Sequence, residues 1–311
     1  MKDKLKISVV IPVFNSEETI EILVASLMSE LKVYPSYEII LINDCSDKDN
    51  SYQKCIRLSE SNQVIKFLEL SRNFGEHNAV MAGLNFCSGT IAVIMDDDFQ
   101  HSPSDIHKLI NEIKNGSDVV FSRYIEKKHN IFRNLGSKFN NFVATLLMQK
   151  PSDLYLSSFK AINRFTINEV IKYSGPFPYI DGLILRFTRN YSTVLTGHSE
   201  RESGTSGYTL SKLIGLWLNM FVNFSITPLR LATSFGIVIA LLSFIFITFV
   251  IINKFFYPHE PMGWASLISA VLFLGGVQLL TIGILGEYLG KLFMSQVGQP
   301  QFVIREKKNL D

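Results

Sequence analysis

Several common sequence features are missing from this chain of 311 residues. Neither GxGxxG nor GxxxxGK[ST] occurs, so neither common glycine-rich phosphate loop is present. The three cysteines, Cys45, Cys55 and Cys87, are odd in number and form no CxxC pair, which favours a reducing compartment. The formal net charge is only +2, so the chain has no basic field for DNA or RNA, and we expect no nucleic-acid partner.

Charge is also scarce near the C-terminus. Of 58 Asp, Glu, Lys and Arg residues, only nine lie beyond Leu231. Two stretches in this region, Leu231–Ile252 and Trp264–Leu285, carry no charge at all. Each is long enough for a spanning helix, which needs roughly 20 residues. We therefore predict a two-helix transmembrane hairpin, with a pair of buried core helices as the alternative interpretation.

Basic residues predict how this hairpin is oriented. The loop between the two stretches holds only Lys254, which Glu260 offsets. The flanking segments hold Lys212, Arg230, Lys291, Arg305, Lys307 and Lys308. The positive-inside rule then places both termini and the N-terminal domain in the cytoplasm. Just before the first span, Leu210–Phe224 is rich in Leu, Trp, Met and Phe, which favours an interfacial helix over a core helix.

The first 230 residues alternate strand-like and helix-like segments. The strand-like runs are Ile7–Ile11, Tyr37–Ile42, Val64–Leu70, Ile91–Met95 and Val119–Phe121. Amphipathic stretches lie between them at Glu18–Leu31, Glu76–Phe86 and Pro103–Lys114. This alternation predicts an α/β fold with a mostly parallel sheet covered on both faces. We expect a cytoplasmic domain over residues 1–208, an interfacial segment over 209–228, two transmembrane helices over 229–290 and a cytoplasmic tail over 291–311.

Polar clusters follow five of the predicted strands. They occur at Pro12–Glu17, Asn43–Ser46, Ser71–Gly75, Asp96–Gln100 and Ser122–Tyr124. Ligands of open α/β sheets bind beyond the carboxyl ends of the strands. One polar strand end is an ordinary turn, but five of them predict a cleft along this edge.

The acidic run Asp96-Asp97-Asp98 is the sharpest of these clusters. Carboxylates so close together repel one another unless a cation lies between them. The oxygen ligands of Asp96, Asp98 and Gln100 suit Mg²⁺ or Mn²⁺, which would bridge to the phosphates of a nucleotide. The alternative is a helix cap and a solvated turn before the helix at Pro103.

With no glycine-rich loop, the neutralisation of a diphosphate falls to the metal and to basic side chains. Arg72, Arg123, Arg133 and Arg201 are candidates because guanidinium binds phosphate in a bidentate fork. A surface ion pair is the alternative for each of them. Arg123 and Arg201 are favoured because they adjoin a strand end and a Gly/Ser-rich loop.

The motifs, taken in order, resemble a known family. VVIPVFNSEETI, LINDCS, LSRNFGEHNAVMAGL and VIMDDDFQHSP are similar to the nucleotide-sugar domain of family-two glycosyltransferases. HSERESGTSGY, the two apolar stretches and GEYLGKLF narrow the resemblance to polyprenyl-phosphate glycosyltransferases, a group that includes bactoprenol glucosyltransferases. The resemblance covers nearly the whole chain and implies a GT-A-like sheet followed by the membrane hairpin.

This resemblance implies roles for the donor side of the cleft. Pro12, Glu17 and Asp44 would hold the base and ribose of the nucleotide, and Arg72 would lie over it. Asp96 and Asp98 correspond to the family's DxD motif, and Gln100 to a further metal contact. Asp97 stands where the family has a small residue, and the sequence leaves its role open.

Other roles concern the acceptor and the chemistry. Arg123 and Arg133 resemble a pair that grips the phosphate of a lipid acceptor, and Arg201 resembles a residue that closes over the diphosphate. Asp153 lies where members carry an acid ahead of an aromatic and a basic residue, and it is a candidate catalytic or positioning carboxylate. A helix cap or loop acid is the alternative for Asp153.

Members transfer a sugar from a nucleotide donor to a lipid phosphate. The resemblance therefore implies a Mg²⁺- or Mn²⁺-dependent, inverting glycosyltransferase acting on undecaprenyl phosphate at the cytoplasmic face of the bacterial inner membrane. It also implies a homo-oligomer, a tetramer in relatives. UDP is the favoured donor nucleotide and GDP stays open, as does the sugar. The alternatives are a hydroxyl-directed polysaccharide glycosyltransferase and a membrane-anchored sugar-nucleotide sensor.

Overall fold

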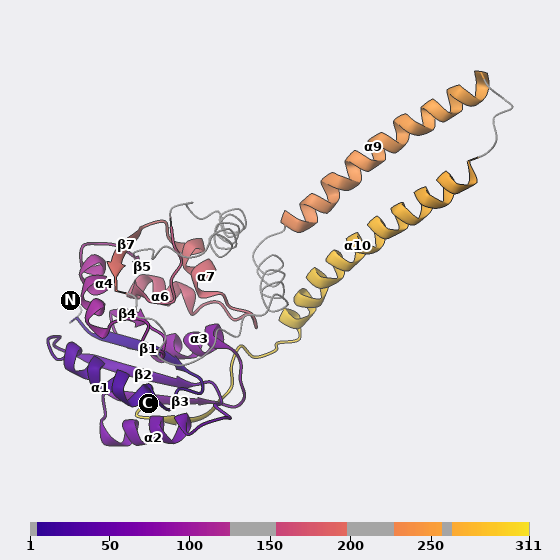
Figure 1. The fold of residues 1–311 in the computed structure, drawn as a ribbon. Coiled ribbons are helices and arrows are strands. Elements are labelled where there is room, and N and C mark those ends of the chain that lie inside the picture. The colour runs from indigo at the N-terminus through magenta and orange to yellow at the C-terminus, as the bar shows by residue number, and fades with distance from the viewer. Residues whose placement is uncertain (1–4, 125–153, 198–226, 257–262, 311) are drawn as a thin grey trace. The chain divides into compact units, whose positions relative to one another are not determined.

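The computed structural model describes residues 5–124, 154–197, 227–256 and 263–310. Two compact units are present, one formed by residues 1–207 with 299–311 and the other by residues 208–298. The predicted interfacial segment Leu210–Phe224 lies outside the described residues, so it stays a prediction. The first unit is an α/β domain, and the second contains two long helices (Figure 1).

The α/β unit is built on an eight-stranded sheet in the order β7-β5-β6-β4-β1-β2-β3-β8. The strands are β1 (Ile7–Val13), β2 (Tyr37–Asn43), β3 (Ile65–Leu70), β4 (Ile91–Ile94), β5 (Val119–Tyr124), β6 (Lys160–Asn163), β7 (Tyr191–Thr196) and β8 (Ile304–Lys308). Neighbours pair in parallel except where β6 or β8 takes part. The five predicted strands are confirmed within two or three residues at their ends.

Helices cover both faces of this sheet because both faces are apolar. In β1, Val9 and Ile11 belong to one hydrophobic cluster, while Val10 between them belongs to the other. The first cluster is covered by α1 (Ile20–Leu31), α2 (Ser51–Ser61) and α4 (Ile106–Lys114). The second is covered by α3 (Glu76–Phe86), α6 (Arg164–Val170) and α7 (Ile180–Phe187). A sheet buried on both sides is what continuous apolar strands predict.

The strand β8 was not predicted. Residues 291–311 read as a charged tail, but α10 continues through Gln296 and Ile304–Lys308 then pairs antiparallel with the edge strand β3. The alternating charges of Ile304–Lys308 are typical of an edge strand with one face in water. The chain therefore returns from the second unit to complete the sheet of the first.

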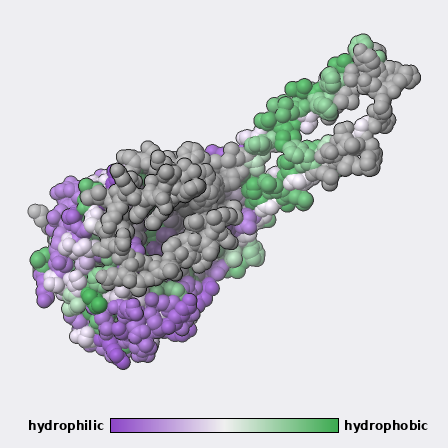
Figure 2. Space-filling model, in the orientation of Figure 1, coloured by the Kyte–Doolittle hydropathy of each residue, from purple (hydrophilic) through white to green (hydrophobic). Residues whose placement is uncertain are grey.

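The second unit consists of α9 (Thr227–Phe256) and α10 (Trp264–Gln296), which run side by side (Figure 1). Both apolar stretches are thus helical, as predicted. Among the described residues, one helix, Phe273–Gln296, is long and apolar enough to cross a membrane, whereas the apolar part of α9, Ala232–Phe246, is shorter. The described parts of both helices expose mainly hydrophobic side chains (Figure 2). The two-span hairpin itself stays a prediction.

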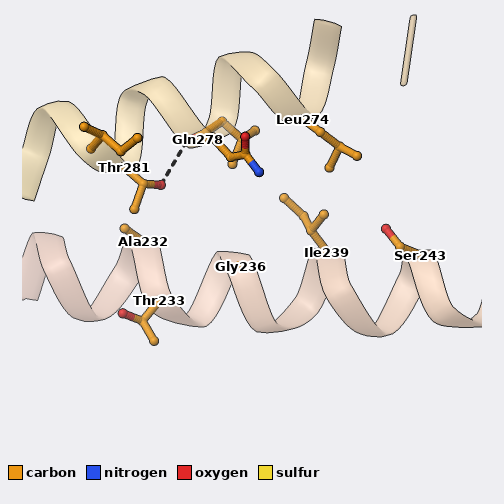
Figure 3. Close-up of a pocket in the computed structure, with 10 residues that line it drawn as sticks. Ala232, Thr233, Gly236, Ile239, Ser243, Leu274, Gln278 and Thr281 are labelled. Atoms are coloured by element: carbon orange, nitrogen blue, oxygen red, sulfur yellow. Dashed lines mark hydrogen bonds between the residues drawn. The ribbon is translucent and has the colours of Figure 1, made fainter. Parts of the chain in front are cut away.

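A groove of about 490 Å³ lies between α9 and α10. Gly236 and Ile239 line it from α9, and Leu274 and Gln278 line it from α10 (Figure 3). The Thr281 hydroxyl donates to the Val277 carbonyl at 2.9 Å within α10, a bond that Thr side chains within helices commonly make.

Candidate active site

The carboxyl ends of the parallel strands hold a cavity of about 460 Å³. Its described walls are the loop after β1 (Phe14–Thr19), the loop after β2 (Lys48 and Asp49) and the loop after β4 (Asp97–Phe99). These loops share an edge because β1 pairs in parallel with both β2 and β4. Of the five polar strand ends in the predicted cleft, those after β1 and β4 line this cavity, and the full extent of the cleft stays a prediction.

Backbone strain gathers at the same edge. Among the described residues, positive φ outside glycine occurs at Asn15 (54°), Cys45 (57°), Phe99 (59°) and Asn309 (57°). The first three lie in the loops after β1, β2 and β4. The left-handed region costs energy for residues with a side chain, most of all for a bulky one such as Phe99. Strain that recurs in three adjacent loops marks this edge as the functional one.

The loop after β1 is braced against the loop after β2. The Asn15 side-chain oxygen accepts the amides of Asp47 and Lys48 at 3.2 and 3.1 Å, and the Asn15 amide donates to Ser46 Oγ at 3.0 Å. Glu17 accepts the Asn50 amide at 3.0 Å, and hydrogen bonds from Asn50 hold the pKa of Glu17 below its ordinary value. Glu17 thus lines the cavity with its carboxylate charged and joins the start of α2 to this loop, and its contact with a nucleotide stays a prediction.

Asp96 begins the acidic loop, and two neighbouring side chains fix its carboxylate. Ser158 donates a hydrogen bond to it, and His101 Nε2 lies 3.8 Å from its Oδ2. Burial works to raise the pKa of Asp96, but the interactions with His101 and Ser158 outweigh it, so the pKa is lowered. Asp96 is therefore an ionised carboxylate with a fixed orientation, which suits a metal ligand.

Asp97 points to a different partner. Its Oδ2 accepts the Phe14 amide at 3.1 Å and the Ser16 hydroxyl, both in the loop after β1. Burial, together with the charges of Asp96 and Asp98, raises its pKa to about 6 despite these two hydrogen bonds. The carboxylate whose role the sequence left open thus connects two walls of the cavity.

Asp98 and Gln100 complete the set of candidate metal ligands. Asp98 lines the cavity, and its Oδ1 accepts the Gln100 amide at 3.1 Å, so the loop turns tightly through Phe99. Within the described ranges, no three His, Cys, Asp or Glu side chains form a closed metal cage. Mg²⁺ typically binds through one or two carboxylates and the phosphates of a substrate. The hard oxygen donors of this loop, and the mutual repulsion of its carboxylates, fit such an ion.

Asp44 directly follows the strand β2 and is almost fully buried. It accepts the Phe74 amide at 2.7 Å and the Gly75 amide at 2.8 Å, and burial outweighs these bonds to raise its pKa. Asp44 therefore holds the loop after β3. In that loop the Arg72 guanidinium lies 4.5 Å from the centroid of the Phe74 ring, which orients an otherwise exposed side chain. A role of Asp44 and Arg72 in nucleotide binding stays a prediction.

A buried ion pair lies beside the acidic loop. Lys160, at the start of β6, donates to Asp181 at the start of α7, and both side chains are less than a tenth exposed. Glu76, exposed at the start of α3, belongs to the same electrostatic group: partial desolvation and the charge of Asp96 raise its pKa. The positive charge of Lys160 works the other way on both Glu76 and Asp96. Lys160 thus offsets part of the negative charge gathered here.

The remaining predicted residues divide into two sets. Pro12 is buried in β1 opposite Ile42, and Arg123 is exposed near the end of β5. Arg133, Asp153 and Arg201 lie outside the described residues, so their assignments stay predictions. The structure therefore brings Glu17 and Asp98 to one cavity, and it places Asp96, Asp44, Arg72 and Arg123 on strand ends that point toward the same edge.

Several residues of this site were missed by sequence reasoning. Lys48 and Ser158 lie in no quoted motif, and Ser16 and His101 lie within the quoted motifs but were given no role. Lys48 brings a positive charge to the cavity wall, and Ser158 reaches Asp96 from a segment 62 positions away. Contacts between such distant segments become visible only once the sheet order is known.

Comparison with known proteins agrees with this architecture. Residues 8–172 match the model of glycosyl transferase family 2, and residues 227–292 match that of the GtrB C-terminal hairpin. A solved structure of glucosyl-3-phosphoglycerate synthase from Mycobacterium tuberculosis, in complex with Mn²⁺, UDP-glucose and phosphoglyceric acid, has the same fold. It superimposes with a TM-score of 0.54 at 18% identity, covering 71% of this chain and 79% of that one.

Two relatives align over almost the entire sequence. The undecaprenyl-phosphate 4-deoxy-4-formamido-L-arabinose transferase of Yersinia enterocolitica is 31% identical over 304 residues, which cover 97% of this chain and 93% of that protein. An uncharacterised glycosyltransferase of Synechocystis is 30% identical over 311 residues, which cover 99% of this chain and 97% of that protein. On the fold, the acidic loop and these matches, the chain belongs to glycosyl transferase family 2 and is a glycosyltransferase.

Proposed function

We propose that this enzyme transfers a sugar from a nucleotide-sugar, with UDP as the favoured nucleotide, to undecaprenyl phosphate with inversion at the anomeric carbon. The observation that carries the proposal is the shared cavity wall of Glu17 and Asp98, which brings a predicted nucleoside contact and a predicted metal ligand together. The Yersinia relative, whose name gives undecaprenyl phosphate as the acceptor, supports the choice of acceptor.

The donor would lie along the carboxyl edge of the sheet. Glu17 would bind the ribose or base, and the oxygen ligands of Asp96, Asp98 and Gln100 would hold Mg²⁺ or Mn²⁺. When bound, a divalent ion offsets the charge that develops on the leaving nucleoside diphosphate. The fixed orientation of Asp96 by Ser158 keeps that carboxylate in place without rearrangement during the reaction.

The bond changes follow from the acceptor. A phosphate oxygen of the lipid attacks the anomeric carbon, the bond from that carbon to the diphosphate oxygen breaks, and the nucleoside diphosphate leaves with the electron pair. Because the lipid phosphate is already anionic at neutral pH, no strong general base is required. The chain's task is to hold two anions in line, and the exposed guanidinium of Arg123, with Arg133, would offset their repulsion. Arg201 would add to the stabilisation of the leaving diphosphate.

The second unit would keep this reaction at the membrane. In the proposed topology, α9 and α10 both cross the bilayer, and the basic flanks retain the α/β unit and both termini in the cytoplasm. The apolar surfaces of the two helices and the match to a C-terminal hairpin family support this arrangement. The lipid phosphate then lies at headgroup depth, within reach of a domain tethered at the surface.

The test is direct. The purified full-length protein is incubated with undecaprenyl phosphate, Mg²⁺ or Mn²⁺, and a panel of UDP- and GDP-sugars, and a glycosylated lipid is sought by mass. A product from one donor would support the proposal and identify the sugar. Donor hydrolysis without a lipid product would contradict the acceptor. No donor consumption, while a relative is active in the same preparation, would favour a sugar-nucleotide sensor.

A further inference from the structure

The most informative unassigned contact in the molecule is the one that Asp97 makes. Its neighbours Asp96 and Asp98 are the proposed metal ligands, yet the Asp97 carboxylate is already engaged with the loop after β1. Two donors in that loop, the Phe14 amide and the Ser16 hydroxyl, meet a single oxygen of Asp97. The residues that this contact joins are more than 80 positions apart in sequence, and both loops line the same cavity.

The loop that Asp97 holds is tied firmly to the β2 side, where the Ser16 amide donates to Ser51 Oγ and the Glu17 amide donates to Asp49. Asp97 supplies its described side-chain hydrogen bonds to the acidic loop. The loop after β1 contains Asn15 at a φ of 54°, a conformation that the chain adopts only where surrounding contacts enforce it. On one side, Asn15 is held by the loop after β2. On the other side, the described contacts to Phe14 and Ser16 include those of Asp97. Glu17 follows directly in sequence, so its position relative to the acidic loop depends on this bracing.

We propose that Asp97 is a positioning residue that ties the nucleoside-binding loop to the metal-binding loop, so that the base and the diphosphate of one donor are bound at a fixed separation. This inference rests on the proposed function, since it names how the donor site is assembled. A side chain that points at the neighbouring loop makes hydrogen bonds that a small residue at this position could not make. Asp97 thus serves to fix the position of the loop after β1 relative to the acidic loop.

Substitutions separate this role from that of a further metal ligand. Asp97→Asn keeps an oxygen that accepts from both Phe14 and Ser16 but removes the charge, whereas Asp97→Ala removes the acceptor. Ser16→Ala removes one of the two donors. If Asp97 bridges the two loops, Asp97→Ala should weaken nucleotide binding about tenfold. Ser16→Ala should cause a smaller loss of affinity, and Asp97→Asn should bind nucleotide about as well as the wild type.

Binding is measured by calorimetry with UDP and with GDP, each in the presence of Mn²⁺, on the full-length protein in detergent. In the double variant Ser16→Ala/Asp97→Ala, the loss should be smaller than the sum of the single losses, because both variants break the same bridge. Equal binding by Asp97→Ala and the wild type would overturn the proposal. An Asn variant as impaired as the Ala variant would assign Asp97 to the metal and would also overturn it.

A second measurement needs no ligand. Hydrogen exchange of the peptide that covers residues 11–19 should speed up in Asp97→Ala and stay near the wild-type rate in Asp97→Asn, because Asp97 protects the Phe14 amide. Unchanged exchange in the Ala variant would contradict the bridge itself. If the folded wild type binds neither diphosphate while its exchange pattern agrees with the bridge, the proposed function fails and the positioning role of Asp97 falls with it. That outcome is distinct from a wild type that binds and an Ala variant that binds equally well.

Discussion

A carboxylate at one end of the central sheet and a carboxylate at the other have pKa values shifted in opposite directions. At the amino end, Glu38 of β2 meets Lys6 at 2.9 Å, Lys66 at 2.8 Å, Ser8 at 2.6 Å and the Ser88 amide at 2.7 Å. Burial alone would raise the pKa of Glu38, but the hydrogen bonds from Lys66, Ser8 and Ser88 lower it to about 2. At the carboxyl end, Asp97 has a pKa raised to about 6.

The carboxylate at the amino end stabilises the fold, whereas carboxylates at the carboxyl end are available for binding. Glu38 is fully paired, so its charge is favourable in the folded protein. The acidic loop carries more negative charge than its neighbours offset, and it therefore has unused capacity to bind a cation. Within that loop Asp97 has the raised pKa and is engaged with the loop after β1, whereas Asp96 has a lowered pKa and is available, with Asp98, to a metal.

The largest effect on the transfer rate is expected when a carboxylate of the acidic loop is removed. Asp98→Ala should lower transfer about a thousandfold, or ~4 kcal/mol of transition-state stabilisation, and should leave the unfolding temperature unchanged or higher. The measurement is the rate of glycolipid formation with Mg²⁺ or Mn²⁺, beside thermal unfolding. Glu60→Ala, an exposed acid on α2, is the control. Undiminished turnover in Asp98→Ala would remove Asp98 from the metal site.

The opposite end should respond in stability alone. Glu38→Gln should lower the free energy of unfolding by about 3 kcal/mol at neutral pH, because a carboxylate held near pKa 2 is stabilised by its partners. A lowered folded pKa makes this contribution complete above the unfolded value and lost as pH falls toward 2. The wild type and the variant should therefore converge in thermal unfolding between about pH 4.5 and pH 2. A constant gap across that window would show that Glu38 acts through packing.

Sequence reasoning reached one of these ends and not the other. Apolar runs and the polar residues after them predict β1 to β5 and the cleft, because periodicity and strand-end chemistry are local. Glu38 gave no signal, since Lys6, Lys66 and Ser88 reach it from three separate segments. The antiparallel strands β6 and β8 were not predicted for the same reason, because each pairs with a strand that is distant in sequence: β6 with β4 and β8 with β3. The role of Asp97 likewise required the position of Ser16.

A smaller effect should distinguish parts of the carboxyl end. Arg123 lies near the end of β5, three strands from β1 in the sheet order, so it is expected to serve the acceptor and not the nucleoside. Arg123→Ala should raise the KM for undecaprenyl phosphate about tenfold, ~1.4 kcal/mol, and change the donor KM by less than about twofold. Arg186→Ala, an exposed arginine on α7, is the matched control. Equal losses for donor and acceptor would place Arg123 elsewhere.

The smallest effect is expected for the strand β8, which pairs with β3 and contacts the loop after β3. Arg305 donates to the Ser71 carbonyl at 2.8 Å, and the Ser71 amide donates to the Val303 carbonyl at 2.8 Å, so β8 holds the start of the loop that carries Arg72. Because Arg305 is exposed, Arg305→Ala should raise the donor KM only about threefold, ~0.7 kcal/mol.

The control for this substitution lies two residues further along the same strand. Within the described residues the Lys307 side chain makes no hydrogen bond or ion pair, so Lys307→Ala removes an equal charge without touching the loop. Steady-state kinetics with varied donor should show an increase in KM for Arg305→Ala alone, with the acceptor KM unchanged. An equal increase in both variants would mean that β8 acts through its charge, and no increase in either would mean that Asp44 alone is sufficient to hold the loop after β3.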